Sequence, residues 1–203
     1  MQSYSSDELT IKEQNKILIG AIGPRPIALI SSQSDEEVVN VAPFSYFNII
    51  SYRPAIVSVS VQRINGQMKD TARNIISNQE AVVHIVDEDN VALANQTSRH
   101  LPAEDSELNY ANFTTVKSSV VKPPGLEEAK VRFETSLYNH TEIYNGDEVT
   151  ADVLMLRIET FHLAKEIYDK DTGYIDVRKL AAVGRLAGQD YAKIGEFFSI
   201  ERP

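Results

Sequence analysis

The residues at positions 63–74, RINGQMKDTARN, combine two cations with the start of a helical pattern. Arg63 and Lys69 flank a glycine-containing loop, and Asp70 and Thr71 stand where the helix would begin. The first backbone N–H groups of a helix have no intrahelical partner and carry partial positive charge. A helix start beside two cations therefore suits an anion, most naturally a phosphate. The alternative is a surface helix capped by Asp70 or Thr71, and this segment alone favours that alternative.

Further segments place hydroxyl and amide groups where strands would end. Ser31 and Ser32 close a short apolar run, and residues 40–48, NVAPFSYFN, alternate small and polar side chains with aromatic ones. Such an edge suits a flat ring rich in heteroatoms, because Asn offers a donor and an acceptor and Ser a hydroxyl. The alternatives are serines that form a turn and an edge strand with ordinary aromatic packing.

The elements that would position these groups are mostly strands. Apolar runs and alternation predict strands at residues 26–31, 38–47, 55–61, 81–86, 131–143 and 149–161. Helical spacing predicts short helices at residues 11–19, 71–78 and 177–182, and one through residue 94 that the acidic residues 87–89 cap. Residues 98–125 and 184–191 are predicted to be loops, and Asn145-Gly146 is predicted to turn the hairpin between the two long strands. Without a linker or repeat, the pattern predicts one domain over residues 1–203, built as a closed or partly closed β-barrel.

The composition excludes several classes of function. The 203 residues are 42% hydrophobic and 24% charged, as in a globular protein, and the formal charge of −9 argues against a nucleic-acid binder. There is no cysteine, which excludes disulfides, thiolate metal sites and iron–sulfur clusters, so any redox role needs an organic cofactor or haem. No apolar run reaches the ~20 residues of a membrane span, and no signal peptide is evident, so we expect no membrane partner and a cytoplasmic location.

The four histidines, His84, His100, His140 and His162, form no close pair with one another or with carboxylates at ligand spacing. No metal site is therefore predicted. His84 lies inside an apolar strand and is predicted to be a hydrogen-bonded core residue. No Ser–His–Asp order and no GxGxxG after a strand is present, so neither a hydrolase nor Rossmann-type dinucleotide binding is predicted.

Five blocks of the sequence resemble the flavin reductase-like domain family of FMN-binding split barrels, which includes flavoredoxin. They are PRPIALISS, NVAPFSYFNIIS, RPAIVSVS, KDTARNI and AVVHIV, and the likeness continues to residue 191. Their common order and spacing make the resemblance specific. It implies a mainly β protein with short helices, a Greek-key split β-barrel. It also implies a homodimer that binds one FMN per subunit near the dimer interface.

The resemblance also implies which residues hold FMN. The strand-end serines would approach the ribityl chain and the phosphate, the block from residue 40 to residue 47 would line the ring, and the helix start would take the phosphate. In chain order these residues are Ser31, Ser32, Asn40, Ala42, Pro43, Ser45, Phe47, Ser60, Arg63, Lys69, Asp70 and Thr71. Lys69 and Thr71 are the main phosphate candidates, with Arg63 next. Asp70 is expected to order the loop and cap the helix, because two anions would repel.

The implied function is an FMN-dependent oxidoreductase, a flavin reductase-like enzyme whose electron donor is NAD(P)H. Electrons would pass to free flavin, to a small acceptor or to a partner protein. Two alternatives remain open: a flavoredoxin-like electron carrier that does not use NAD(P)H directly, and a non-catalytic protein that binds or senses flavin. No catalytic residue is assigned. His162 stands where family members often carry a histidine, and its role is either near the flavin or nicotinamide, or only structural.

Overall fold

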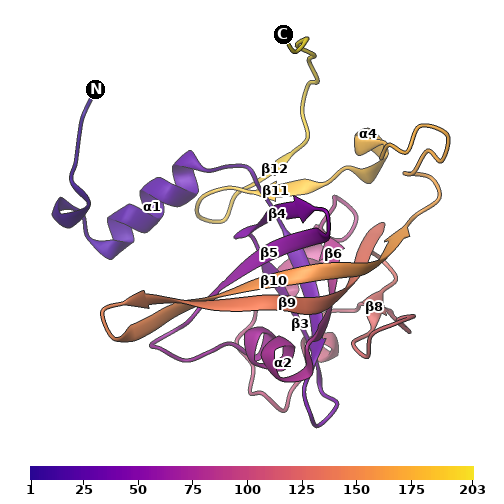
Figure 1. Cartoon of the computed structure of the whole chain (residues 1–203), viewed down its shortest axis with the longest axis horizontal. Coiled ribbons are helices and arrows are strands. Elements are labelled where there is room, and N and C mark those ends of the chain that lie inside the picture. Colours follow the sequence, from indigo (N-terminus) through magenta and orange to yellow (C-terminus); the bar gives the residue numbers. More distant parts are fainter.

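The computed structural model describes residues 1–203 and consists mainly of antiparallel strands (Figure 1). Seven strands form one sheet in the order β3-β2-β6-β9-β10-β5-β4. Their bounds are β2 Ala28–Gln33, β3 Val39–Phe44, β4 Phe47–Tyr52, β5 Ala55–Gln62, β6 Glu80–Ile85, β9 Val131–Asn145 and β10 Glu148–Leu163. The two edge strands, β3 and β4, are consecutive in the chain, and the Ser60 N–H donates to the Tyr46 carbonyl at the corner between them. The sheet therefore curls until its edges meet at this corner.

Smaller elements surround this sheet. A three-stranded sheet joins β1 (Arg25–Pro26), β11 (Val183–Arg185) and β12 (Tyr191–Lys193), and β7 (Thr115–Val116) pairs with β8 (Gly125–Leu126). The helices are α1 (Ile11–Ala21), α2 (Asp70–Asn78), α3 (Val91–Gln96) and α4 (Val177–Leu180), with single 3-10 turns at Ser6–Glu8 and Glu107–Asn109. Helix α1 lies to one side of the barrel, with none of its residues buried, and α2 lies across the barrel's end (Figure 1).

Two hydrophobic clusters lie on opposite faces of β2. Ala28 and Ile30 belong to a 13-residue cluster inside the barrel, which Ala72 and Ile75 of α2 close at one end. Leu29, the residue between them in sequence, belongs to a second cluster that α3 and the following loop cover. Successive side chains of a strand point to opposite faces, so burial on both faces explains why this strand reads as a continuous apolar run.

The structure confirms the predicted strands and the hairpin between the long strands, but the turn residues are Gly146 and Asp147, one position later than predicted, and Gly146 has a positive φ of 61°. Three other expectations were wrong in detail. The strand predicted at residues 38–47 is two strands, because the chain turns the barrel corner after Phe44. The loop predicted at residues 184–191 includes most of β11 and the start of β12, and residues 98–125 include β7, the start of β8 and a 3-10 turn. These strands have only two or three residues, too few to show periodicity.

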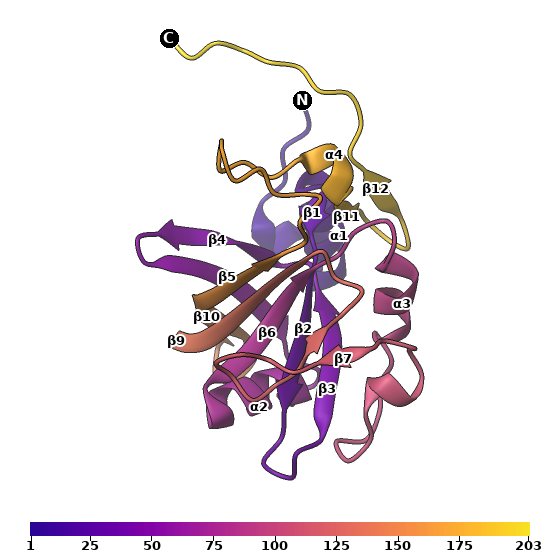
Figure 2. The same cartoon turned by 90° about the vertical axis from the view of Figure 1, so that its right-hand side faces the viewer.

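The four predicted helices are present with slightly different bounds: α1, α2 and α3 extend one or two residues beyond the prediction, and α4 is shorter. Asn90 precedes α3, and the carboxylate of Asp87 accepts the backbone N–H groups of Asp89 and Asn90 just before that helix. Helix α4 has four residues rather than six. None of the helices has the length and apolar character that crossing a membrane requires. The β4–β5 hairpin extends to one side of the barrel, as Figure 2 shows.

Candidate functional site

A shallow cavity of about 270 Å³ lies where α1, the β3–β4 corner, β5, the start of α2 and the loop after β11 meet. We call it the cationic cavity, because three cations and no carboxylate line it. The cations are Arg25, Lys69 and Arg185. The other lining residues are Asn15, Ile19, Pro43, Phe44, Ser45, Tyr46, Ser60, Gln62, Leu186 and Gly188. In a protein of formal charge −9, this arrangement is suited to an anionic ligand.

Lys69 is the cation at the start of α2. It occupies the N-cap position with extended backbone, and no side chain caps the helix there. The first N–H groups of α2 are thus left without a side-chain acceptor. Burial lowers the pKa of Lys69, its ammonium lies 5.9 Å from the centre of the Phe44 ring, and it forms no ion pair. A half-buried ammonium beside an open helix N-terminus is a strong site for a phosphate.

The structure brings four of the twelve predicted site residues to this cavity: Pro43, Ser45, Ser60 and Lys69. Ser45 and Ser60 add hydroxyl groups along the edge between the β3–β4 corner and β5. The Ser60 hydroxyl accepts a hydrogen bond from Gln62, and the Ser45 hydroxyl faces the Arg25 Nε at 3.5 Å. These four predicted residues therefore lie together on the surface of the cationic cavity.

Asn40 and Thr71 contact each other rather than the cavity. The Asn40 amide donates to the Thr71 hydroxyl at 2.7 Å, and both side chains are buried. This hydrogen bond ties β3 to the first turn of α2. Their contribution in the structure is therefore to fix where the helix begins, one residue after Lys69.

Ser31 and Ser32 are fully buried and also lie away from the cavity lining. The Ser31 hydroxyl donates to the Pro124 carbonyl at 2.5 Å, and the Ser32 hydroxyl accepts from the Asn74 amide at 3.4 Å. Both serines thus connect β2 to neighbouring segments, where their hydroxyl groups satisfy buried polar partners.

Arg63 is engaged by carboxylates of the long β9–β10 hairpin. Its guanidinium donates twice to Asp152, at 2.9 and 2.8 Å, and once to Glu142, at 2.7 Å. His140 Nε2 lies 2.9 Å from the same Asp152 carboxylate, which has no exposed area. Burial by itself raises the pKa of Asp152, but the hydrogen bonds from Arg63 and His140 outweigh it and lower the pKa. Arg63 does not line the cavity, and the structure gives it the role of holding the loop before Lys69.

The other three predicted residues have distinct places. Ala42 packs against the barrel core, and Phe47 lies at the edge of that core, where it lines a neighbouring groove. Asp70 forms an ion pair with Arg73 within the first turns of α2. The expectation that Asp70 caps the helix was wrong: Lys69 is the N-cap, no side chain caps α2, and the Asp70 carboxylate is instead neutralised by Arg73 within the helix.

His84 is a satisfied core residue, as predicted. Its Nδ1 donates to the Leu29 carbonyl at 2.8 Å, and its Nε2 accepts the Leu126 N–H at 2.9 Å. This pairing defines the neutral tautomer, because Nε2 must be unprotonated to accept. Complete burial lowers the pKa of His84 to about 4.

His162 is paired with a buried carboxylate. Its Nε2 lies 2.6 Å from Glu134, which also accepts the backbone N–H groups of Ser119 and Val120. These contacts fasten the segment before β8 to the sheet. His162 lines a small separate pocket rather than the cationic cavity, so its structural role is the one that the geometry supports.

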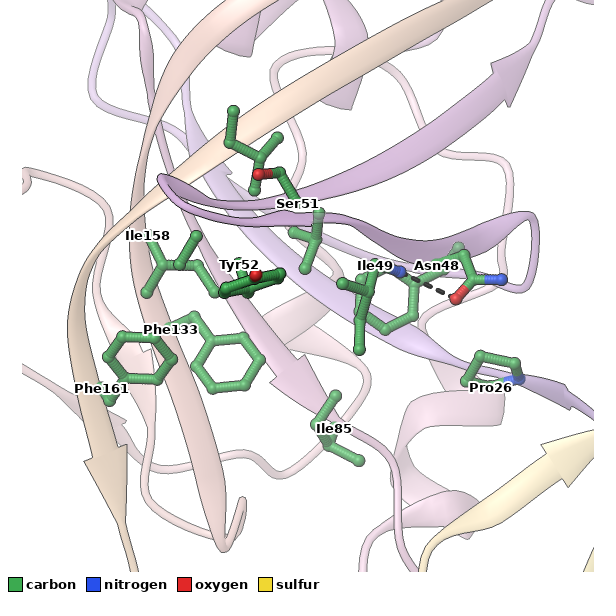
Figure 3. A pocket seen from close by; sticks show the side chains of 13 residues that line it. Pro26, Asn48, Ile49, Ser51, Tyr52, Ile85, Phe133, Ile158 and Phe161 are labelled. Atoms are coloured by element: carbon green, nitrogen blue, oxygen red, sulfur yellow. Dashed lines mark hydrogen bonds between the residues drawn. The ribbon is translucent and has the colours of Figure 1, made fainter. Parts of the chain in front are cut away.

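An apolar pocket of about 500 Å³ lies between the β4–β5 hairpin and the ends of β9 and β10 (Figure 3). Phe133 and Phe161 meet edge to face there, with ring centres 5.3 Å apart, and Tyr52 projects from the hairpin (Figure 3). A groove of about 470 Å³ shares Ile19, Arg25, Ser45 and Tyr46 with the cationic cavity. The same groove shares Pro26, Phe47 and Asn48 with the apolar pocket. The three hollows therefore follow one another along one side of the molecule.

Comparisons with known proteins agree with this architecture. Residues 21–181 match the model of the flavin reductase like domain. The crystal structure of nitrilotriacetate monooxygenase component B from Bacillus cereus is 43% identical, with a TM-score of 0.95 over 98% of both chains. The 2-nitrobenzoate 2-nitroreductase NbaA from Pseudomonas fluorescens is 25% identical, with a TM-score of 0.89 over 100% of this chain and 96% of that one. A split barrel domain protein from Shewanella frigidimarina, 15% identical, superposes with a TM-score of 0.84 over the whole of both chains, which confirms the predicted split barrel.

Proposed function

Because this chain belongs to the flavin reductase-like domain family, we propose that it is an FMN-dependent oxidoreductase that uses NAD(P)H as its electron donor. The observation that carries the proposal is the cationic cavity. Lys69, at the open start of α2, supplies an ammonium and backbone donors for a phosphate, and no carboxylate lines the cavity. Arg25 and Arg185 add two further positive charges. A phosphorylated flavin fits this donor set better than uncharged riboflavin does.

The polar edge of the cavity suits the remainder of the cofactor. Ser45 and Ser60 offer hydroxyl groups that can donate or accept, and the Gln62 amide lies beside them. When bound, FMN supplies the capacity to accept a hydride and to release one or two electrons. The chain's own residues bind the phosphate, orient the ring and limit which molecules approach it.

The groove and the apolar pocket beyond the cavity leave room for a donor or an acceptor. The pocket is lined by aromatic and aliphatic side chains, which suit a flat, weakly polar molecule. We propose that NAD(P)H approaches from this side and that electrons leave to free flavin, a small acceptor or a partner protein. The similar protein from Pseudomonas fluorescens is a nitroreductase, which supports a small acceptor, and the one from Bacillus cereus is a component of a monooxygenase, which supports a role beside another protein.

We further propose that the protein works as a homodimer through the face that carries the β4–β5 hairpin. On this hairpin Ile49 and Tyr52 are 74% and 90% exposed, and both line the apolar pocket, so a second subunit would form part of the wall of that pocket. Apolar surface of this kind is stabilised when it is removed from water. Ile49→Glu is expected to shift sedimentation towards a monomer, whereas Ile143→Glu, at an exposed position on the long hairpin, should not. A wild-type monomer at micromolar concentration would overturn this part.

The experiment that tests the function begins with FMN uptake. Purified protein is titrated with FMN and then mixed anaerobically with NADH or NADPH while the visible flavin absorbance is followed. Bleaching by a nicotinamide supports the reductase. Bleaching by dithionite or a reduced protein alone would instead indicate an electron carrier, and protein that takes up no FMN would overturn the proposal.

A further inference from the structure

We propose that Arg25 is a positioning residue that holds together three walls of the cationic cavity: α1, the loop after β11 and the β3–β4 corner. We call these contacts the clasp. FMN affinity then depends on the shape of the Arg25 guanidinium and not only on its charge. The effect on FMN rests on the proposed function, whereas the clasp itself can be tested without a ligand. Arg25 was not among the residues that the sequence assigned to the site.

The contacts of Arg25 join the end of α1, which lies just before it in the chain, to the loop after β11, 161 residues away. One terminal nitrogen, Nη1, donates to the carbonyls of Ile19 and Ile22, both at 2.8 Å. The other, Nη2, donates to the Leu186 carbonyl at 3.0 Å. The side chain is buried and forms no ion pair, so these carbonyls are what stabilises its charge.

Helix α1 depends on this contact because it contributes no buried residue to the core. Ile19 lies in its last turn and Ile22 is its C-cap, where carbonyl groups lack intrahelical partners and carry partial negative charge. The guanidinium therefore caps the helix. The other side-chain hydrogen bond between α1 and the barrel joins the Tyr46 hydroxyl to Asn15, at 3.1 Å on the surface.

The second wall is held because β1 and β11 pack unusually close together. Arg25 pairs with Arg185 in the antiparallel register, and Pro26 pairs with Gly184. A Cβ on Gly184 would lie 2.5 Å from the Pro24 Cβ, so only glycine allows this approach. The approach brings the loop after β11 within reach of the Arg25 side chain, which then binds the Leu186 carbonyl.

These contacts converge on the proposed cofactor site. Ile19, Leu186 and Ser45, which respectively belong to α1, the loop after β11 and the β3–β4 corner, all line the cationic cavity. Arg25 touches all three segments. A planar guanidinium with five donors can bridge them at once, whereas the ammonium of lysine is a single point of charge that cannot span both carbonyl groups of α1 and the one of Leu186. Arg25→Lys therefore keeps the charge and removes the clasp.

The test compares Arg25→Lys, Arg25→Met and wild-type protein, with Arg99→Lys as a matched control at an exposed position. In the apoprotein, amide hydrogen exchange of residues 11–22 and 186–190 should be faster in both Arg25 variants than in wild type. FMN affinity should fall by roughly tenfold or more in both, since the hydrogen bonds that hold the cavity walls in place before FMN binds are lost. The visible spectrum of the bound flavin should also change, and Arg99→Lys should leave affinity, spectrum and exchange as in wild type.

If Arg25→Lys binds FMN like wild type while Arg25→Met does not, the charge alone acts and the clasp is wrong. The clasp is also wrong if neither Arg25 variant changes amide hydrogen exchange or FMN affinity. If wild-type protein binds no FMN, the proposed function fails, and the exchange measurement still tests the clasp. If the Arg25 variants do not fold, Gly184→Ala pushes β11 away from β1 and so moves the Leu186 carbonyl away from Arg25, and exchange of residues 186–190 and FMN affinity like those of wild type would overturn the inference.

Discussion

Replacing Lys69 with methionine tests the proposed phosphate site directly. Methionine keeps most of the length and the apolar stem of lysine, so the packing beside Phe44 is preserved while the ammonium is lost. No carboxylate pairs with Lys69. The substitution therefore leaves no buried anion unpaired, unlike the removal of one partner of an ion pair.

The expected size follows from the contact that is lost. A hydrogen bond to a charged group contributes about 1.5–3 kcal/mol, which corresponds to FMN affinity about 10- to 140-fold lower in Lys69→Met. Riboflavin lacks the phosphate, so its affinity should change by less than about twofold, within the effect of an ordinary surface substitution. Burial disfavours the charged form of Lys69, as its lowered pKa indicates. The free energy of unfolding of the apoprotein should consequently not fall.

Fluorescence titration with FMN and riboflavin measures both affinities, and urea denaturation measures the stability of the apoprotein. Lys170→Met, at an exposed position in a turn after β10, is the matched control and should bind both flavins like wild type. Equal losses for FMN and riboflavin would mean that the substitution disturbs the ring site rather than the phosphate site. Unchanged FMN affinity would place the phosphate elsewhere and refute the assignment of Lys69.

Three further substitutions test contacts in the interior of the structure. Arg63→Leu leaves the carboxylate of Asp152 buried without its main partner, and the free energy of unfolding in urea should fall by about 3–5 kcal/mol, while the ratio of FMN to riboflavin affinity stays unchanged. His84 has a folded pKa of about 4, below its unfolded value, so stability is complete above pH ~6.5 and should fall by up to ~3 kcal/mol as the pH drops towards 4. His84→Gln should weaken that dependence in urea titrations at several pH values, and an unchanged profile would contradict the assignment. Gly184→Ala should lower the melting temperature, because its Cβ would overlap Pro24, with a cost of about 1–3 kcal/mol.

The fold could be predicted from the sequence because local patterns determine most of it. The alternation in β5 and the hairpin turn at Gly146 are properties of neighbouring residues, and the structure has both, with the turn one position later than predicted. The pairing of β1 with β11 could not be predicted this way. These strands have two and three residues, and their pairing depends on the close approach of Pro24 to Gly184, across 160 positions of the chain.

Only part of the site could be predicted, because a local sequence does not show which distant partner a polar side chain will meet. Lys69 and Arg63 are both cations near a helix start, and nothing local distinguishes them. Arg63 is neutralised by Glu142 and Asp152, which lie 79 and 89 residues away and reach it only once the β9–β10 hairpin has formed. Serine and asparagine are similarly ambiguous, because a hydroxyl or amide group that suits a ligand equally suits a buried partner. The hydrogen bond between Asn40 and Thr71 is of the second kind.

The partners of the cations explain how an acidic protein can keep a positive cavity. Several cations of the structure are neutralised by a carboxylate, as Arg63 is by Asp152. The three cavity cations are held differently: Arg25 by backbone carbonyls, Lys69 near the Phe44 ring, and Arg185 on the ring of Tyr191 at 4.5 Å. Carbonyl and ring contacts orient a cation without cancelling its formal charge. The positive charge of the cavity is thus retained for an incoming anion, while the net charge of −9 disfavours polyanions such as nucleic acids.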